Sequence, residues 1–131
     1  MTGSTVFRKE GSTMKYMLLL YSAPDAGPDP QSPEGEAQLG RWFAITDEMA
    51  KAGVLVSGDA LQPTETATTL RERDGEVLLT DGPFAETKET LGGYYLIDVP
   101  DLDAATEWAA KMPLAPYGSV EIRAIQEFDR A

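Results

Sequence analysis

The 131-residue sequence predicts one α+β domain of the split βαβ type, with a β-hairpin inserted between its two halves. Segments rich in β-branched, aromatic and aliphatic residues alternate with two segments in which apolar residues recur every three or four positions, the period of an amphipathic helix. The dipeptide Asp74-Gly75 lies between two short strand-like segments and is the strongest short signal for a hairpin. The expected order is strand, helix, strand, hairpin, strand, helix, strand.

The first half opens with the apolar run 15–21 (KYMLLLY), which has the composition of a buried strand. Segment 22–33 contains four prolines and reads as a loop. A helix is expected from Pro33 to Gly53, with acidic residues in its first turn and an apolar face made by Leu39, Trp42, Phe43, Met49 and Ala50. A short strand over 54–61 follows, in which Gly58 leaves room for a bulge or the close approach of a ligand.

The inserted hairpin is expected to pair 66–73 with 76–80, because Asp-Gly tolerates the positive φ angles of a type I′ turn. The next strand is expected over 93–99, where β propensity is high.

The second helix is expected over 101–112, with a core face made by Leu102, Ala105, Trp108, Ala109 and Met112. The alternating segment 119–124 has the pattern of a last strand with one wet face. In this order the elements make a ferredoxin-like fold, in which two helices can cover only one face of the sheet.

The charge of the chain limits its partners. It carries 22 acidic against 11 basic residues, a net charge of −11, and has no basic cluster, so neither nucleic acid nor an anionic membrane is an expected partner. The sequence contains no cysteine and no histidine. Acid-base chemistry would therefore fall to carboxylates, tyrosine or lysine, and no cofactor is expected.

Residues 1–13 are polar and lack periodicity, which predicts a disordered extension or tag ahead of a single domain over 14–131. They contain no long apolar stretch of the kind found in a signal peptide, so the expected location is the cytoplasm.

Segment 81–89 (DGPFAETKE) is the main candidate site, with two interpretations. In the functional one, Asp81 and either Glu86 or Glu89 line a pocket and act as general acid and base, since burial and like charges raise a carboxyl pKa. Lys88 would then hold an anionic substrate. In the structural interpretation, Asp81 caps a turn, Gly82 relieves steric strain in the backbone before Pro83, and Pro83 begins a single helical turn.

Tyr94 and Tyr95 are neighbours on a strand and must point to opposite faces, so one joins the core and the other can stack on a flat small molecule in a cleft. The candidate ligand-binding residues are Asp59, Phe84, Lys88, Tyr94 and Tyr95. A metal site built from Asp59, Asp81, Glu86 and Glu89 is a weaker alternative because their spacing matches no known calcium loop, and no metal is expected.

Four segments resemble the DGPF branch of the YCII-related proteins: 52–63 (AGVLVSGDALQP), 81–89 (DGPFAETKE), 91–99 (LGGYYLIDV) and 118–123 (GSVEIR). The resemblance covers about 14–128. It implies a homodimer in which two sheets meet as a dimeric α/β barrel, a pocket near segment 81–89, and an association with extracytoplasmic-function sigma factors. The histidine and aspartate pair of the shorter branch cannot be carried over, because this chain has no histidine.

Two functions follow as hypotheses. The first is a cytoplasmic homodimer that binds a small molecule in a cleft between sheet and hairpin, with cofactor-free catalysis by Asp81 and a glutamate of the motif. The second is a non-catalytic regulatory or protein-interaction module, with 81–89 as its recognition loop. In the first case Ile122→Lys should disrupt the dimer, provided that Ile122 points away from the helices.

Overall fold

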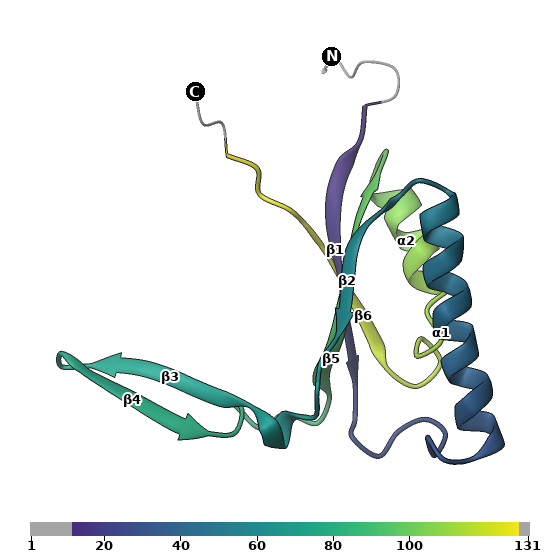
Figure 1. Ribbon diagram of the computed structural model, residues 1–131. Coiled ribbons are helices and arrows are strands. Elements are labelled where there is room, and N and C mark those ends of the chain that lie inside the picture. The colour runs from purple at the N-terminus through teal and green to yellow at the C-terminus, as the bar shows by residue number, and fades with distance from the viewer. Residues whose placement is uncertain (1–11, 129–131) are drawn as a thin grey trace.

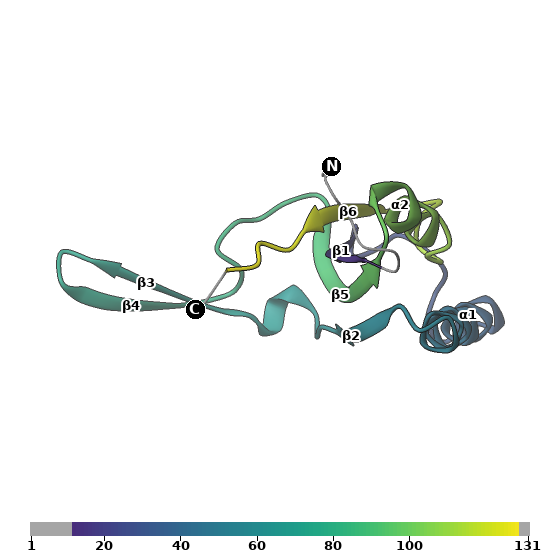
Figure 2. The same cartoon turned by 90° about the horizontal axis from the view of Figure 1, so that it is seen from above.

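The computed structural model describes residues 12–128 and has a four-stranded antiparallel sheet with both helices on one face (Figures 1 and 2). The sheet order is β2-β5-β1-β6. Its elements are β1 (Met14–Ser22), α1 (Pro33–Lys51), β2 (Leu55–Ala60), β5 (Thr90–Val99), α2 (Leu102–Ala110) and β6 (Ser119–Ala124). The α+β class is confirmed, and the arrangement is compatible with the ferredoxin-like fold. The expected extension over 1–13 lies outside the described residues, apart from its last two positions.

The elements start and stop close to the expected positions. Ser32 accepts a hydrogen bond from the Gly35 amide at 3.0 Å and caps α1, and Asp101 accepts one from the Ala104 amide at 2.9 Å and caps α2. Strand β5 begins three residues earlier than expected, at Thr90. A short 3-10 helix, η1 (Thr64–Thr66), was not expected.

The core lies between the main sheet and the two helices. Alternation along β1 turns Tyr16, Leu18 and Leu20 inward. The largest fully buried side chains are Leu18, Met49, Ile97, Val99 and Met112. At the surface, the two helices are joined by an ion pair of 2.6 Å between Lys111 Nζ and Glu48 Oε2.

The face of α1 that meets the sheet differs from the expected one. Leu39 and Phe43 are 54% and 67% exposed, and Ala50 is exposed, whereas Gln38, Ile45 and Met49 are buried. Met49 and the half-buried Trp42 of the expected face do pack against the core, whereas Leu39, Phe43 and Ala50 do not. Leu102 on α2 is likewise exposed rather than part of the core. Apolar periodicity therefore predicted the helices correctly, but not which apolar residues the sheet would cover.

The opposite face of the main sheet has no helix over it (Figure 2). Leu19 pairs with Tyr94 and Met17 with Leu96, one residue out of phase with the core positions, so these four half-buried side chains lie on this open face. Ile122 pairs with Leu18 and packs against the core. The condition attached to the Ile122→Lys test is therefore not met, and Leu19 is the suitable position.

Strands β3 (Thr68–Arg73) and β4 (Glu76–Asp81) form a separate two-stranded sheet, called the arm here, that projects from the body (Figures 1 and 2). The φ angles of Asp74 and Gly75 are 53° and 80°, which confirms the predicted turn chemistry. Leu70 is paired with Leu79, and both are more than 60% exposed. An isolated two-stranded hairpin is marginally stable in water, and the leucines of this arm add no buried core to it.

Candidate functional site

A pocket of 420 Å³ lies between α1 and the main sheet, within the size range of small-molecule sites. We call it the aromatic pocket, because five of its lining residues carry aromatic rings: Trp42 and Phe43 of α1, Tyr94 and Tyr95 of β5, and Tyr117 of the α2–β6 connection. Thr46, Asp59, Gly58 and Leu39 are among the other lining residues. The pocket thus has mostly apolar walls with a few polar groups.

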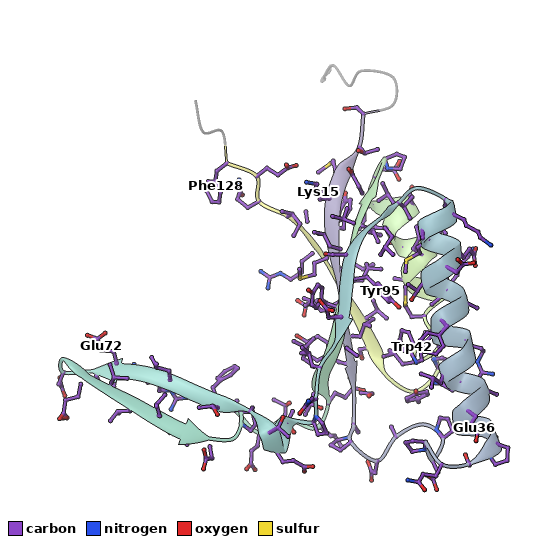
Figure 3. The ribbon with its side chains drawn as sticks, viewed as in Figure 1. Lys15, Glu36, Trp42, Glu72, Tyr95 and Phe128 are labelled. Atoms are coloured by element: carbon purple, nitrogen blue, oxygen red, sulfur yellow. The ribbon has the colours of Figure 1, made fainter. Side chains whose placement is uncertain are left out.

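Tyr95 is the most firmly held of these rings. Its ring lies 6.5 Å from that of Trp42 in a stacked arrangement, and Figure 3 shows the two side chains meeting between sheet and helix. Thr46 Oγ1 donates to the Trp42 carbonyl at 2.9 Å, so its oxygen accepts the proton of the Tyr95 hydroxyl, 2.5 Å away. These two contacts fix the ring as a wall of the pocket.

Gly58 makes room for that ring. A Cβ atom at position 58 would lie 2.5 Å from Tyr95 Cδ1 and 2.9 Å from the Tyr94 carbonyl oxygen. The close approach that the sequence predicts at Gly58 is therefore an approach by Tyr95. An irregularity of register is also present in β2, between Leu55 and Ser57.

Tyr94 is a lining residue of the pocket, but its side chain lies on the open face of the sheet, opposite to that of Tyr95. The Tyr94 hydroxyl donates to Asp59 Oδ2 at 2.8 Å, across the β2–β5 pairing. The hydrogen bond to this carboxylate and the carboxylate's negative charge raise the pKa of Tyr94 above its ordinary value of 10.0. The phenol therefore stays protonated beyond the pH range in which a free tyrosine ionises.

Asp59→Asn should lower the pKa of Tyr94 toward its ordinary value, because it removes the negative charge that opposes ionisation. The stabilisation linked to this raised pKa is complete below pH 10.0 and is lost as the pH rises through the folded-state pKa, so wild type should lose stability there more steeply than the variant. Ultraviolet titration of phenolate, with Tyr94→Phe to identify the signal, measures the shift. Asp47→Asn is the control, and an unchanged Tyr94 titration in Asp59→Asn would refute the assignment.

The predicted catalytic carboxylates lie away from this pocket. Asp81 ends β4 at the base of the arm and is exposed, as is Glu86. Glu89 is half-buried and accepts a hydrogen bond from Ser119 Oγ at 2.8 Å. In the described part of the chain, none of the three lines the aromatic pocket or the larger groove considered below.

Segment 82–89 instead connects the arm to β5. Gly82 has a φ of 105°, donates its amide proton to Ala67 O at 2.7 Å and accepts from Thr69 Oγ1 at 2.8 Å. The segment consists of bends, without the helical turn expected at Pro83. Phe84 and Lys88 are exposed, and of the candidate ligand-binding residues only Asp59, Tyr94 and Tyr95 come together. The catalytic and ligand-binding roles of this segment stay predictions.

Within residues 12–128, no three acidic side chains are close enough together to hold a metal ion, so the four carboxylates weighed as ligands form no such group. No helix over the same range combines the length and apolar character needed to cross a bilayer.

Comparison with known sequences agrees with this fold. The YCII-related domain matches residues 14–129, and the chain therefore belongs to the YCII-related family. It is similar to an uncharacterized protein of Rhizobium meliloti (strain 1021), with 38% identity over 112 residues that cover 84% of this chain and 90% of that relative. The family resemblance is confirmed, while membership of the DGPF branch stays a prediction.

The pocket residues that sequence reasoning missed include Leu39, Trp42, Phe43, Thr46 and Tyr117. Aromatic and aliphatic residues on a helix are most often core residues, which is why Phe43 was placed there. The available signal was that the helix carries more apolar residues than one stripe can hold. Leu39 and Phe43 are four residues apart and form a second stripe next to the core stripe.

Proposed function

We propose that this protein is a homodimer that binds a flat, largely apolar small molecule in the aromatic pocket. The observation that carries the proposal is the pocket itself, in which aromatic rings surround a space of 420 Å³ and only a few polar groups face it. Such a combination of apolar walls and sparse polar groups is typical of small-molecule sites. Phe43 supports the proposal further, because a ring that is 67% exposed has no role in the core.

The polar groups favour a neutral ligand with a hydrogen-bond donor. The Asp59 carboxylate is bonded to Tyr94 on the open face of the sheet, so the polar groups on the helix side are the hydroxyls of Thr46 and Tyr95. The Tyr95 hydroxyl donates its proton to Thr46 and keeps lone pairs for a hydroxyl or amino group of the ligand. The net charge of −11 disfavours an anion here. Phenols, anilines and indoles fit this description.

A second copy of the chain is the partner that we propose for the open sheet face. Met17, Leu19 and Leu96 form an apolar surface there, and pairing two such faces would produce the dimeric α/β barrel. Acid-base catalysis by Asp81, Glu86 or Glu89 is not required for this function and stays a prediction. The interaction-module alternative gains no support from the aromatic pocket.

Indole and phenol should raise the melting temperature of the protein, since a ligand at a hundred times its Kd adds about 2.7 kcal/mol of stability. Phe43→Ala should weaken binding by several-fold to about tenfold, because it removes one aromatic contact from the pocket without opening the core. Phe128→Ala is a matched control, as Phe128 is 78% exposed and does not line the pocket. Calorimetric titration measures both affinities. Absence of saturable binding by indole, phenol and aniline, or equal weakening in the two variants, would refute the proposal.

A further inference from the structure

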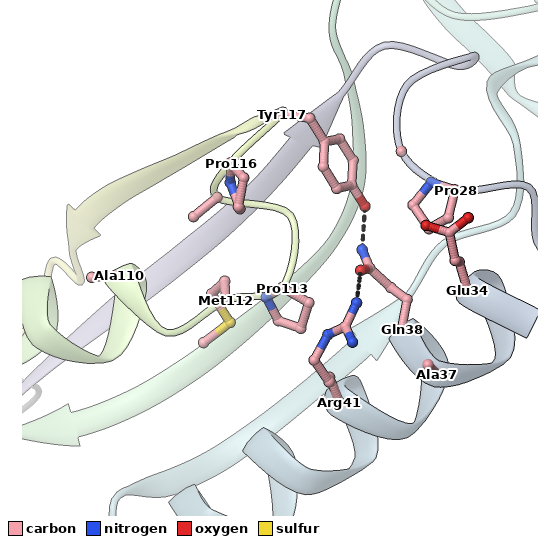
Figure 4. A pocket seen from close by; sticks show the side chains of 12 residues that line it. Pro28, Glu34, Ala37, Gln38, Arg41, Ala110, Met112, Pro113, Pro116 and Tyr117 are labelled. Carbon is pink, nitrogen blue, oxygen red and sulfur yellow. Dashed lines mark hydrogen bonds between the residues drawn. The ribbon is translucent and has the colours of Figure 1, made fainter.

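A second hollow lies on the other side of Tyr117, between α1 and the connection from α2 to β6 (Figure 4). It has a volume of 770 Å³, and we call it the proline groove because Pro28, Pro113 and Pro116 line it. Tyr117 lines both this groove and the aromatic pocket. From α1 the groove receives the side chains of Glu34, Gln38 and Arg41.

A chain of hydrogen bonds holds Arg41 in place (Figure 4). Arg41 Nη2 donates to Gln38 Oε1 at 2.8 Å, and Gln38 Nε2 donates to the Tyr117 hydroxyl at 2.5 Å. Gln38 is only 8% exposed and is a buried polar side chain of the core. A buried amide whose oxygen and nitrogen are both hydrogen-bonded thus orients the guanidinium and reduces the entropy that binding would cost.

Gln38, which accepts the hydrogen bond from Arg41, is uncharged and does not neutralise the guanidinium. Ion pairs in the described chain join Lys51, Lys111 and Arg123 to carboxylates, but no carboxylate oxygen of residues 12–128 lies within 4.0 Å of Arg41. Arg71 and Arg73 lack such a partner too, but they lie on the arm and donate to backbone carbonyls. Arg41 is distinguished by its position in a groove, with further N–H groups left for a ligand.

We propose that the proline groove binds a small monocarboxylate with an apolar body, whose carboxylate accepts hydrogen bonds from Arg41. The planar guanidinium can donate two parallel hydrogen bonds to the two oxygens of a carboxylate, and the proline side chains can pack against an apolar body. Glu34 also lines the groove, two helical turns before Arg41 and about 10.5 Å away along the axis. This glutamate and the net charge of −11 oppose a phosphate dianion more strongly than a monoanion.

This site is independent of the function proposed for the aromatic pocket, and its test uses a different signal. Titration of benzoate into the 15N-labelled protein should shift the side-chain Nε–Hε resonance of Arg41 in a saturable manner. Benzyl alcohol, which has the ring but no charge, should leave that resonance unmoved. Phenyl phosphate should bind more weakly than benzoate.

Variants distinguish recognition by the planar guanidinium of Arg41 from a general effect of positive charge. Arg41→Gln should weaken benzoate binding by about tenfold or more, since hydrogen bonds to charged groups are the strong ones, and Arg41→Lys should recover only part of the loss. Gln38→Glu should also weaken binding while Arg41 is retained, because it supplies an internal carboxylate to the guanidinium. Arg123→Gln removes the same charge on β6 and is the matched control.

Three results would overturn the proposal: no saturable benzoate shift at tens of millimolar, equal affinity of wild type and Arg41→Gln, or equal weakening in Arg123→Gln. Tighter binding of phenyl phosphate than of benzoate would overturn the monocarboxylate assignment. Should Arg41→Gln fail to fold, the Arg41 resonance of wild type and the Arg41→Lys variant still decide the question.

Discussion

Replacing Leu19 by lysine should reduce the mass of the protein in solution from twice 14.2 kDa to 14.2 kDa. Leu19 lies in β1, one of the two inner strands, and is paired with Tyr94 of β5 on the sheet face that carries no helix. In the proposed dimer a lysine there would place an unpaired charge in the middle of an apolar interface, which costs more than the contact it replaces. Because the side chain is on the outer face, the fold of the single chain should survive. Light scattering after gel filtration measures the mass, and circular dichroism the fold.

Leu102→Lys is the matched control. Leu102 is 53% exposed on α2, on the helical side of the sheet, so the same substitution there should leave the dimer intact. Ile122→Lys should behave differently from both variants, because Ile122 packs against the core and a lysine would destabilise the chain itself. A wild-type protein that stays a well-folded monomer at micromolar concentration would contradict the proposed dimer.

Gly58→Ala should destabilise the protein by about 1–3 kcal/mol, the usual penalty for overpacking, and should also impair ligand binding in the aromatic pocket. The new Cβ would collide with the Tyr95 ring at 2.5 Å and with the Tyr94 carbonyl at 2.9 Å. The carbonyl belongs to the backbone and cannot turn away, and the ring can move only by leaving its stack with Trp42 and its hydrogen bond to Thr46. Chemical denaturation and indole titration measure the two effects.

Gly40→Ala is the control for Gly58→Ala. Gly40 lies within α1, and a Cβ atom there would meet nothing within 4 Å. Because glycine is a poor helix former, this variant should be more stable than wild type by about 0.5–1 kcal/mol, with unchanged indole affinity. A Gly58→Ala protein as stable as Gly40→Ala would mean that Tyr95 is not confined as the structure indicates.

Much of the candidate site could not be predicted from the sequence. Asp59, Tyr94 and Tyr95 were expected to bind a ligand, and all three are lining residues of the aromatic pocket, although only the Tyr95 side chain points to the helix side of the sheet. Asp81, Glu86 and Lys88 were expected on the basis of a dense polar motif, but the motif connects the base of the arm to β5 and none of these residues lines the pocket.

The role proposed for Arg41 could not be predicted from the sequence either, because it depends on contacts between distant parts of the chain. Its position next to Trp42 says only that it lies beside a core residue on a helix. Gln38, which accepts a hydrogen bond from Arg41, donates one to Tyr117, a residue 79 positions further along the sequence. No local sequence pattern predicts this contact, because it forms only when the α2–β6 connection packs against α1 in the folded chain.

The sequence by itself determined which segments became the two helices and the strands, where the turn of the arm lies, and that neighbouring tyrosines face opposite ways. These properties depend on backbone preferences and periodicity within a few residues. Only the tertiary structure decided which stripe of α1 meets the sheet, that Gly58 admits the Tyr95 ring, and that Arg41 faces a groove. Those outcomes depend on how separate elements pack, and packing is set by the shapes of distant side chains that must fill one common space.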